Sequence, residues 1–235
     1  MDAVNVDDLS TLGFAFLRGV FSSEQLDAIA AHVDAIPSTS PGRLAGAETF
    51  AIRQVMKHAP GLAKHVWNDK LKAAAFEVVG HDAFVSKSIW FDKPAGGNWF
   101  VAFHQDISIH VEGRMEASGF SRWTRKHGLL GVVPPVHVVE RTLTFRIHLD
   151  DATAENGALR VLPATHRCGI LREAPGGAAE VDCPMRAGDV MLMRPLLFHS
   201  SMRSVTNAPR RVLHLEVTDI GLVQGLQWAE IHAIG

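Results

Sequence analysis

A series of short β-prone runs after Gly80 constrains the fold of this chain more than any other feature. The residues between the runs are rich in Gly, Pro, Asn and Asp, which favour turns and interrupt strands. The runs cover residues 83–91, 99–103, 142–149, 158–162, 189–193 and 211–217. Several short strands at this spacing are typical of a β-sandwich or a β-barrel. We therefore expect a mainly β fold.

Two helices are predicted ahead of these strands. Residues 13–21 read as a short strand, and Ser22 follows with Gln25 three positions later, which is the pattern of a capping box. Apolar residues then recur at helical spacing and predict one buried face: Leu26, Ile29, Val33 and Ile36. A second helix is predicted within residues 62–79 and should end at Gly80. Both helices are expected to cover one face of the β-structure.

The composition argues against several classes of protein. Hydrophobic residues make up 47% of the 235 residues and charged residues 20%, which supports a sizeable core and argues against disorder. The formal net charge of −2 gives no reason to expect nucleic acid or an anionic membrane as a partner. The sequence contains no repeat, P-loop or GxGxxG motif, so it gives no support to a phosphate-cradling or dinucleotide-binding fold.

The expected location is the cytoplasm. Cys168 and Cys183 do not make a disulfide framework, and a reducing compartment is the simpler interpretation. The segment MDAVNVDDLS is acidic and lacks the basic and apolar regions of a signal peptide. No apolar run approaches the roughly 18 residues that cross a bilayer. We predict a soluble protein, and its oligomeric state stays open.

The segment FHQDISIH contains His104-Gln105-Asp106, a candidate for two metal ligands. On a strand, residues i and i+2 point the same way, so one strand can deliver both side chains. Two histidines and one carboxylate leave metal positions open, as non-haem iron oxygenases require. The same His-x-acid form recurs at residues 32–34, 110–112, 148–150 and 214–216, so the triplet alone does not identify the site.

His199 is the candidate third ligand, at the end of an apolar strand. Arg210 follows eleven residues later, after the turn-forming Asn-Ala-Pro, where an antiparallel return would bring it near His199. An arginine is suited to clamp a carboxylate with two parallel hydrogen bonds. His148 and Asp150 are also followed by His199 at a plausible spacing, so these observations leave both triplets open.

Five segments, in order along most of the chain, resemble the phytanoyl-CoA dioxygenase-like group of Fe(II)/2-oxoglutarate oxygenases. They are GFAFLRGVFSSEQLDAIAAHVDAI, FDKPAGGNWFVAFHQD, LDDATAENGALRVLPATHR, HSSMRSVTNAPRR and GLQW. Ala164-Thr165 stands where the family usually has Gly-Ser. The resemblance implies a single domain over residues 1–235 with a double-stranded β-helix, or jelly-roll, core. The core would span about residues 83–220, and supporting helices would lie within about residues 22–80.

The resemblance also implies the roles of individual residues. It selects His104, Asp106 and His199 as iron ligands and assigns 148–150 to a structural strand end. It implies that Arg210, rather than its neighbour Arg211, binds 2-oxoglutarate. Further candidates for this cosubstrate are Ser201, Lys87 and Arg146, although the last two could instead be structural ion-pair partners. The triplet at 214–216 is expected on a strand downstream of the site.

The implied cofactors are Fe(II), 2-oxoglutarate and O2. The implied reaction hydroxylates a C–H bond of a small molecule and releases succinate and CO2. The carboxylate of Asp106 favours a hydroxylase over the halogenases of this family, which lack it. Two alternatives remain: a cupin-like metalloenzyme that does not use 2-oxoglutarate, and a catalytically silent member that binds metal or senses. The sequence does not identify the substrate.

A long insertion, residues 113–136, follows the predicted metal strand and contains SRWTRKHG. Its basic cluster is either a solvated loop or part of an active-site lid that attracts an anionic substrate. As a lid, it would place Trp123 over the pocket and Arg122 and Arg125 near the substrate, and it would be poorly ordered without ligand. His110 could also touch the substrate, although a loop edge is the simpler interpretation.

Overall fold

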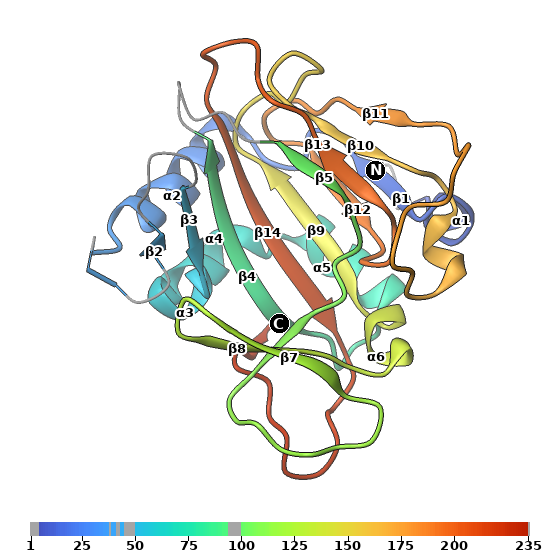
Figure 1. Ribbon diagram of the computed structural model, residues 1–235. Helices are drawn as coiled ribbons and strands as arrows, with labels where there is room; N and C mark the ends of the chain where they lie inside the picture. The colour runs from blue at the N-terminus through green and yellow to red at the C-terminus, as the bar shows by residue number, and fades with distance from the viewer. Residues whose placement is uncertain (1–4, 38, 41–42, 45–49, 94–99, 235) are drawn as a thin grey trace.

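The computed structural model describes residues 5–37, 39–40, 43–44, 50–93 and 100–234 (Figure 1). Its helices are α1 (Val6–Thr11), α2 (Ser23–Asp34), α3 (Val55–His58), η1 (Pro60–Leu62), α4 (Ala63–Val66), α5 (Asp69–Val78), α6 (Val136–Glu140) and η2 (Thr165–Cys168). Its strands are β1 (Phe14–Leu17), β2 (Arg43–Leu44), β3 (Phe50–Arg53), β4 (Phe84–Lys93), β5 (Val101–His104), β6 (Ile109–Val111), β7 (Ser121–Lys126), β8 (Leu129–Val133), β9 (Leu143–His148), β10 (Leu159–Val161), β11 (Val181–Cys183), β12 (Val190–Met193), β13 (His199–Ser201), β14 (Arg210–Thr218) and β15 (His232–Ala233).

The strands form two sheets of a jelly roll and one smaller sheet. The largest sheet has the order β1-β12-β9-β14-β4-β3-β2, and β15 also pairs with β4. A second sheet has the order β11-β10-β13-β5, and the third has the order β6-β8-β7. All pairings between named strands are antiparallel. Figure 1 shows helices α2 to α5 behind the largest sheet and the β13–β5 pair in front of it.

Side-chain alternation along the largest sheet separates an apolar face from a polar one. On β9, Phe145 and Ile147 belong to the main hydrophobic core, together with residues of α2 and α5. On β14, Leu213 and Leu215 join the same core. The residues between them must point to the opposite face, because successive side chains of a strand alternate. Arg146 is one of them, so the sheet delivers polar side chains to the interior of the jelly roll.

The predicted helices are present with one difference. Ser22 and Gln25 form the capping box at the start of α2, each side chain bonding the other's backbone N–H. The second helix is interrupted, because Asn68 begins a new helix by accepting a hydrogen bond from the backbone N–H of Leu71. Of the predicted strand 99–103, residue 99 lies outside the described residues.

The expected loop at 113–136 is largely a β-hairpin. Strands β7 and β8 pair from Ser121↔Val133 to Lys126↔Leu129 and extend the short strand β6. His127 and Gly128 connect them with φ of 52° and 79°. Two consecutive positive φ values are the signature of a type I′ turn, which matches the twist of a two-strand hairpin. The prediction of a loop was therefore wrong for residues 121–133 of the insertion.

The helices are short. The longest described helix, α2, has 12 residues, and no described helix combines the length and apolarity that a membrane span needs.

Candidate metal centre

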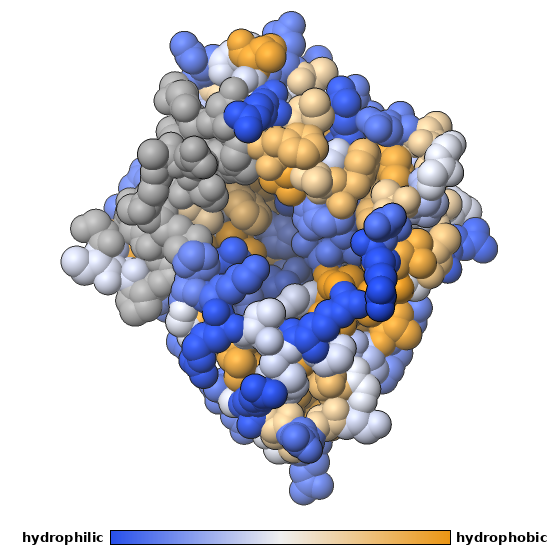
Figure 2. All heavy atoms as spheres, in the orientation of Figure 1, coloured by the Kyte–Doolittle hydropathy of each residue, from blue (hydrophilic) through white to orange (hydrophobic). Residues whose placement is uncertain are grey.

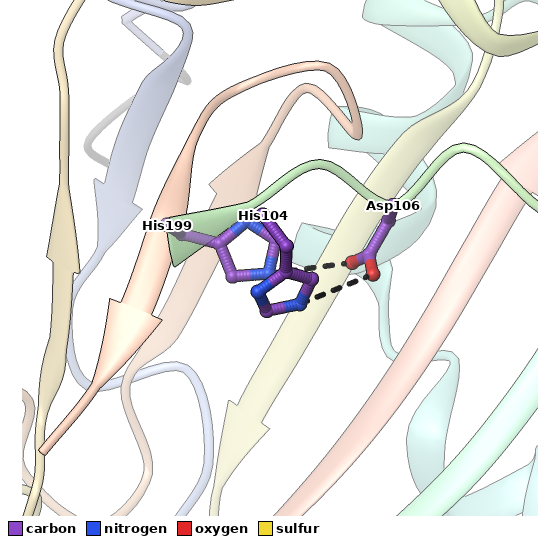
Figure 3. A group of neighbouring side chains, drawn as sticks. All are labelled: His104, Asp106 and His199. Carbon is purple, nitrogen blue, oxygen red and sulfur yellow. Dashed lines mark ion pairs between the residues drawn. The ribbon is translucent and has the colours of Figure 1, made fainter. Parts of the chain in front are cut away.

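His104 and His199 lie opposite each other on paired strands. His104 ends β5, His199 begins β13, and the two residues are direct partners in the antiparallel register. Their ring centroids are 4.2 Å apart. Figure 3 shows both rings turned toward the carboxylate of Asp106, which follows β5 on the same segment. The sheet thus brings together three side chains that are up to 95 residues apart in sequence.

Hydrogen bonds to the backbone orient both imidazole rings. Nδ1 of His104 lies 2.9 Å from the carbonyl oxygen of Ala102, and Nδ1 of His199 lies 2.9 Å from that of Leu197. A carbonyl only accepts, so each Nδ1 carries the hydrogen and each Nε2 keeps its lone pair. These Nε2 atoms lie 3.7 and 3.5 Å from the two carboxylate oxygens of Asp106. Three donor atoms of the types that bind transition metals therefore face one point.

Charges around the site favour the protonation states that a metal requires. Burial alone would raise the pKa of Asp106, but His199, His214, His104 and Lys87 more than offset it and hold that pKa well below its usual range. Burial lowers the pKa of His199 to about 4, although Asp106 opposes the shift. At neutral pH the carboxylate is ionised and His199 is neutral, which are the ligand forms of these groups.

Gln105, the middle residue of the triplet, points away from the donors and fixes their position. Its side-chain amide donates to the carbonyls of Leu196 and Gly169 at 2.7 and 2.8 Å. Its side-chain oxygen accepts from the backbone N–H of Leu171. The sequence interpretation did not assign a role to Gln105. Strand alternation was the available signal, because the residue between two inward ligands must point outward.

A cavity of about 510 Å³ opens beside the three donors. Figure 2 shows the molecule hollowed near the centre of this face, with hydrophilic side chains along the lower rim of the hollow. The described lining contains two carboxylates, Asp106 and Glu216. It also contains six cationic side chains, Arg53, Lys87, Arg122, Lys126, Arg146 and Arg210. This excess of cations makes the cavity suited to anionic ligands.

Arg210 and Arg211 point to opposite faces of β14. Arg210 is 7% exposed, lines the cavity and donates to the hydroxyl of Ser201 at 3.3 Å. Ser201 in turn donates to the carbonyl of Gly157. Arg211 is held away from the cavity by Asp150, whose two carboxylate oxygens accept from its guanidinium at 2.9 and 2.7 Å. The structure therefore offers one of the two arginines to a cavity ligand.

Lys87 and Arg146 also line the cavity, but both have protein partners. Nζ of Lys87 lies 2.6 Å from the Glu216 carboxylate and 2.6 Å from the carbonyl of Ser108. Nη1 of Arg146 lies 3.1 Å from Nδ1 of His214. Because arginine only donates, His214 accepts at Nδ1 and carries its hydrogen on Nε2, 3.5 Å from Glu216.

His214 and Glu216 lie on a strand that follows His199 in the sequence, as expected, but their side chains also reach the site. Their ligand atoms and an Asp106 oxygen all lie within 4.8 Å of one another. Both residues face the jelly-roll interior from β14, which is adjacent to β4 and β9. Alternate residues of β14, His214 and Glu216, therefore lie close to the candidate ligand Asp106.

The hairpin places its basic and aromatic residues on two different faces. Arg122 lines the cavity, whereas Arg125 is outside the described lining. Trp123 packs in a separate hydrophobic cluster on the other face of the small sheet, with the Arg114 guanidinium 5.7 Å from its ring. Trp123 therefore does not cover the pocket. Trp123 and Arg125 alternate with Thr124 and Lys126, which line the cavity. Arg122 lies where the register of β7 shifts, with φ of 52°, and this irregularity lets its side chain also line the cavity.

His110 lies on β6 and lines the cavity. Burial, together with the positive charges of Lys87 and Arg53, lowers its pKa to about 3, although Glu216 opposes the shift. The imidazole is therefore neutral at physiological pH and can donate or accept a hydrogen bond. It is a strand residue rather than part of a solvated loop.

A jelly roll that brings two histidines and one carboxylate to the wall of a cavity has the fold and donor set of non-haem iron oxygenases. The chain belongs to the phytanoyl-CoA dioxygenase (PhyH) family, whose sequence model matches residues 10–212. The predicted family and the predicted fold are thereby confirmed. The chain is 25% identical over 165 residues to "Methylphosphonate hydroxylase" from Gimesia maris. That match covers 66% of this chain and 53% of the relative, so the chain spans about half of its length.

Solved structures share the fold at low sequence identity. EctD from S. alaskensis, crystallised in an apo form, with Fe, and with 2-oxoglutarate and 5-hydroxyectoine, is 18% identical in the apo form. That match has a TM-score of 0.68 and covers 90% of this chain and 75% of EctD. HygX from Streptomyces hygroscopicus, solved with nickel and 2-oxoglutarate, is 16% identical with a TM-score of 0.65, over 97% of this chain and 95% of HygX.

Proposed function

We propose that this protein is an Fe(II)- and 2-oxoglutarate-dependent oxygenase that hydroxylates a C–H bond of a small molecule. His104, Asp106 and His199 would hold the iron. One observation carries the proposal: the backbone hydrogen bonds leave both Nε2 lone pairs free, and both face the Asp106 carboxylate beside the cavity. Iron and 2-oxoglutarate supply the oxidising chemistry with O2 when bound, and succinate and CO2 are the expected co-products.

Buried polar atoms without partners support 2-oxoglutarate as the cosubstrate. Among the described residues that line the cavity, Nε of Arg210 and Nε of Arg146 are buried without a hydrogen bond. Such groups are costly unless a ligand or water satisfies them. Arg210 and Ser201 are the pair that would hold the far carboxylate of the cosubstrate, since Arg211 is occupied by Asp150.

Lys87 and Arg146 have a different role in this proposal. Lys87 neutralises Glu216, and Arg146 fixes the ring of His214, so the two cations position the groups behind Asp106. Residues behind a metal ligand commonly set its orientation and basicity. Arg146 additionally has an unpartnered Nε that could bind the cosubstrate, whereas Lys87 has no need of a further partner.

The substrate is proposed to be a small anionic molecule. The cationic excess in the cavity remains after loading, because the two positive charges of Fe(II) offset the two negative charges of 2-oxoglutarate. The relative from Gimesia maris carries a name that refers to a phosphonate substrate. The presence of Asp106 favours hydroxylation over halogenation, because a carboxylate occupies the position that a halide would take.

Substrate-stimulated decarboxylation of 2-oxoglutarate tests the proposal. The purified protein with Fe(II) and 2-oxoglutarate would be screened against small carboxylates, phosphonates and phosphate esters, and succinate would be quantified. We expect succinate release that increases with substrate and is absent in Asp106→Ala. Metal-dependent turnover without 2-oxoglutarate would favour the cupin-like alternative, and metal binding without turnover of any compound would favour a silent member.

A further inference from the structure

Gly131 occupies the middle of the small sheet and has no backbone need to be glycine. It lies on β8 and pairs with His110 on one side and with Thr124 on the other. Gly131 is absent from the residues with positive φ, so an L-residue would fit its backbone. Glycine weakens the interior of a strand and often marks a position where a ligand approaches closely. The reason for glycine at this position must therefore be the space that a side chain would occupy.

Two hydroxyl groups fill the space that a side chain at Gly131 would take. A Cβ atom there would lie 2.9 Å from Oγ1 of Thr124 and 3.0 Å from Oγ of Ser108. Both residues line the cavity, and neither hydroxyl bonds to another described residue. The hydroxyls of Thr124 and Ser108 thus lie beside the exposed backbone of Gly131, and the neutral imidazole of His110 lies on the same face of the sheet.

Cations surround this patch without carboxylate partners. Arg53 ends β3 and lines the cavity, its Nε is buried without a hydrogen bond, and no described acid pairs with it. Burial lowers its pKa, and no opposing charge compensates. Arg122 and Lys126 lie on the cavity face of β7, where they are exposed, and likewise form no ion pair with a described residue. Two cavity carboxylates are already engaged, Glu216 by Lys87 and Asp106 beside the two candidate histidine ligands.

We propose that the cavity face of the β6–β8–β7 sheet around Gly131, together with Arg53, binds a tetrahedral oxyanion of the substrate, a phosphonate or phosphate group. This inference rests on the proposed oxygenase function, since it assigns the substrate end that is held away from the iron. One hydroxyl from β7, one from Ser108 just before β6, and cations from β3 and β7 approach the patch, which suits three oxygen atoms and a double negative charge. A planar carboxylate would leave part of this set unused.

Binding titrations test the subsite without turnover. The protein is loaded with Ni(II) and saturating 2-oxoglutarate, so that the metal and cosubstrate positions are filled and no oxidation follows. Methylphosphonate and inorganic phosphate are then titrated by calorimetry, with acetate as the planar comparison. We expect both tetrahedral anions to bind at least about tenfold more tightly than acetate.

Matched variants separate the subsite from general charge. Arg53→Gln should weaken methylphosphonate binding by about tenfold or more, and Thr124→Val several-fold, because each removes a hydrogen-bond donor to the anion. Gly131→Ala should weaken it by filling the space between the hydroxyls. Arg125→Gln removes the same charge from the outward face of β7 and should leave binding within about twofold. Thermal unfolding identifies any variant that fails to fold. Thr124 is exposed, so Thr124→Val should fold normally and still test the subsite if a buried variant does not.

Three results would overturn the inference: no binding of either anion, equal binding of acetate, or equal losses in Arg53→Gln and Arg125→Gln. These results are independent of the oxygenase proposal. A protein that binds phosphate at this patch but shows no 2-oxoglutarate binding would contradict the proposed function alone.

Discussion

Replacing Arg210 by Met should nearly abolish 2-oxoglutarate binding, and replacing Arg211 by Met should not. The Arg210 side chain is buried, and among the described residues only the Ser201 hydroxyl accepts a hydrogen bond from its guanidinium. A carboxylate bound there would be desolvated, so loss of its partner leaves an uncompensated buried charge. Such losses cost roughly 3–5 kcal/mol. At 1.36 kcal/mol for each factor of ten, the dissociation constant should rise by roughly two to four orders of magnitude.

Arg211→Met gives the matched control on the neighbouring residue. Its ion pair with Asp150 is partly exposed, with side chains 35% and 17% accessible, so its loss should cost about 1 kcal/mol of stability or less. Affinity for 2-oxoglutarate should change by less than about threefold. Calorimetric titration of 2-oxoglutarate into the Ni(II) form of each variant measures both values. If Arg211→Met is the weaker binder, the face assigned to each arginine is incorrect.

Three further predictions concern the site and its support. Asp106→Ala should abolish tight Fe(II) binding while the circular dichroism spectrum stays unchanged; retained iron affinity in a metal titration would remove Asp106 from the ligand set. Lys87→Met should lower the free energy of unfolding by roughly 3–5 kcal/mol, because it leaves Glu216 buried and unpaired, and Lys87→Met combined with Glu216→Leu should recover much of that loss in urea unfolding. Lowering the pH from 7 to 5.5 should cost about 1.3 kcal/mol of stability through His110, because below about pH 6.5 the unfolded chain takes up a proton on this imidazole and the folded chain, with a pKa of about 3, does not. This part of the pH dependence should be missing in His110→Asn. If the free energy of unfolding of this variant falls with pH as steeply as that of the wild type, His110 takes up its proton equally well in the folded state.

The main features of the fold were accessible from the sequence because local signals agreed with the tertiary arrangement. The capping box of Ser22 and Gln25 and the β-prone run at residues 142–149 both correspond to observed elements. The hairpin at β7 and β8 was missed because all but one residue of β7 is exposed, so its sequence lacks the alternation that marks a half-buried strand. The available signal was His127-Gly128, a two-residue turn of the type that joins hairpin strands.

The site was accessible only in part, because long-range pairing decides which polar residues meet. The sequence selected the triplet at 104–106 with His199 through resemblance, and the structure brings these side chains together. It gave no indication that Glu216 reaches Asp106, which depends on the place of β14 in the sheet. Arg53 was not considered, since the strand that carries it is four residues long and has no distinctive pattern.

The position of β14 has a consequence for how the chain reaches its native state during synthesis. This strand, formed by residues 210–218, lies between β4 and β9, which are made much earlier. Until it emerges from the ribosome, each of those strands keeps an unpaired edge, and unpaired edges promote aggregation. Pairing across such sequence distances is also slow, because loop closure precedes the stabilising contacts. Nascent chains that stop before residue 210 should therefore depend on chaperones, whereas a few further residues complete the central sheet.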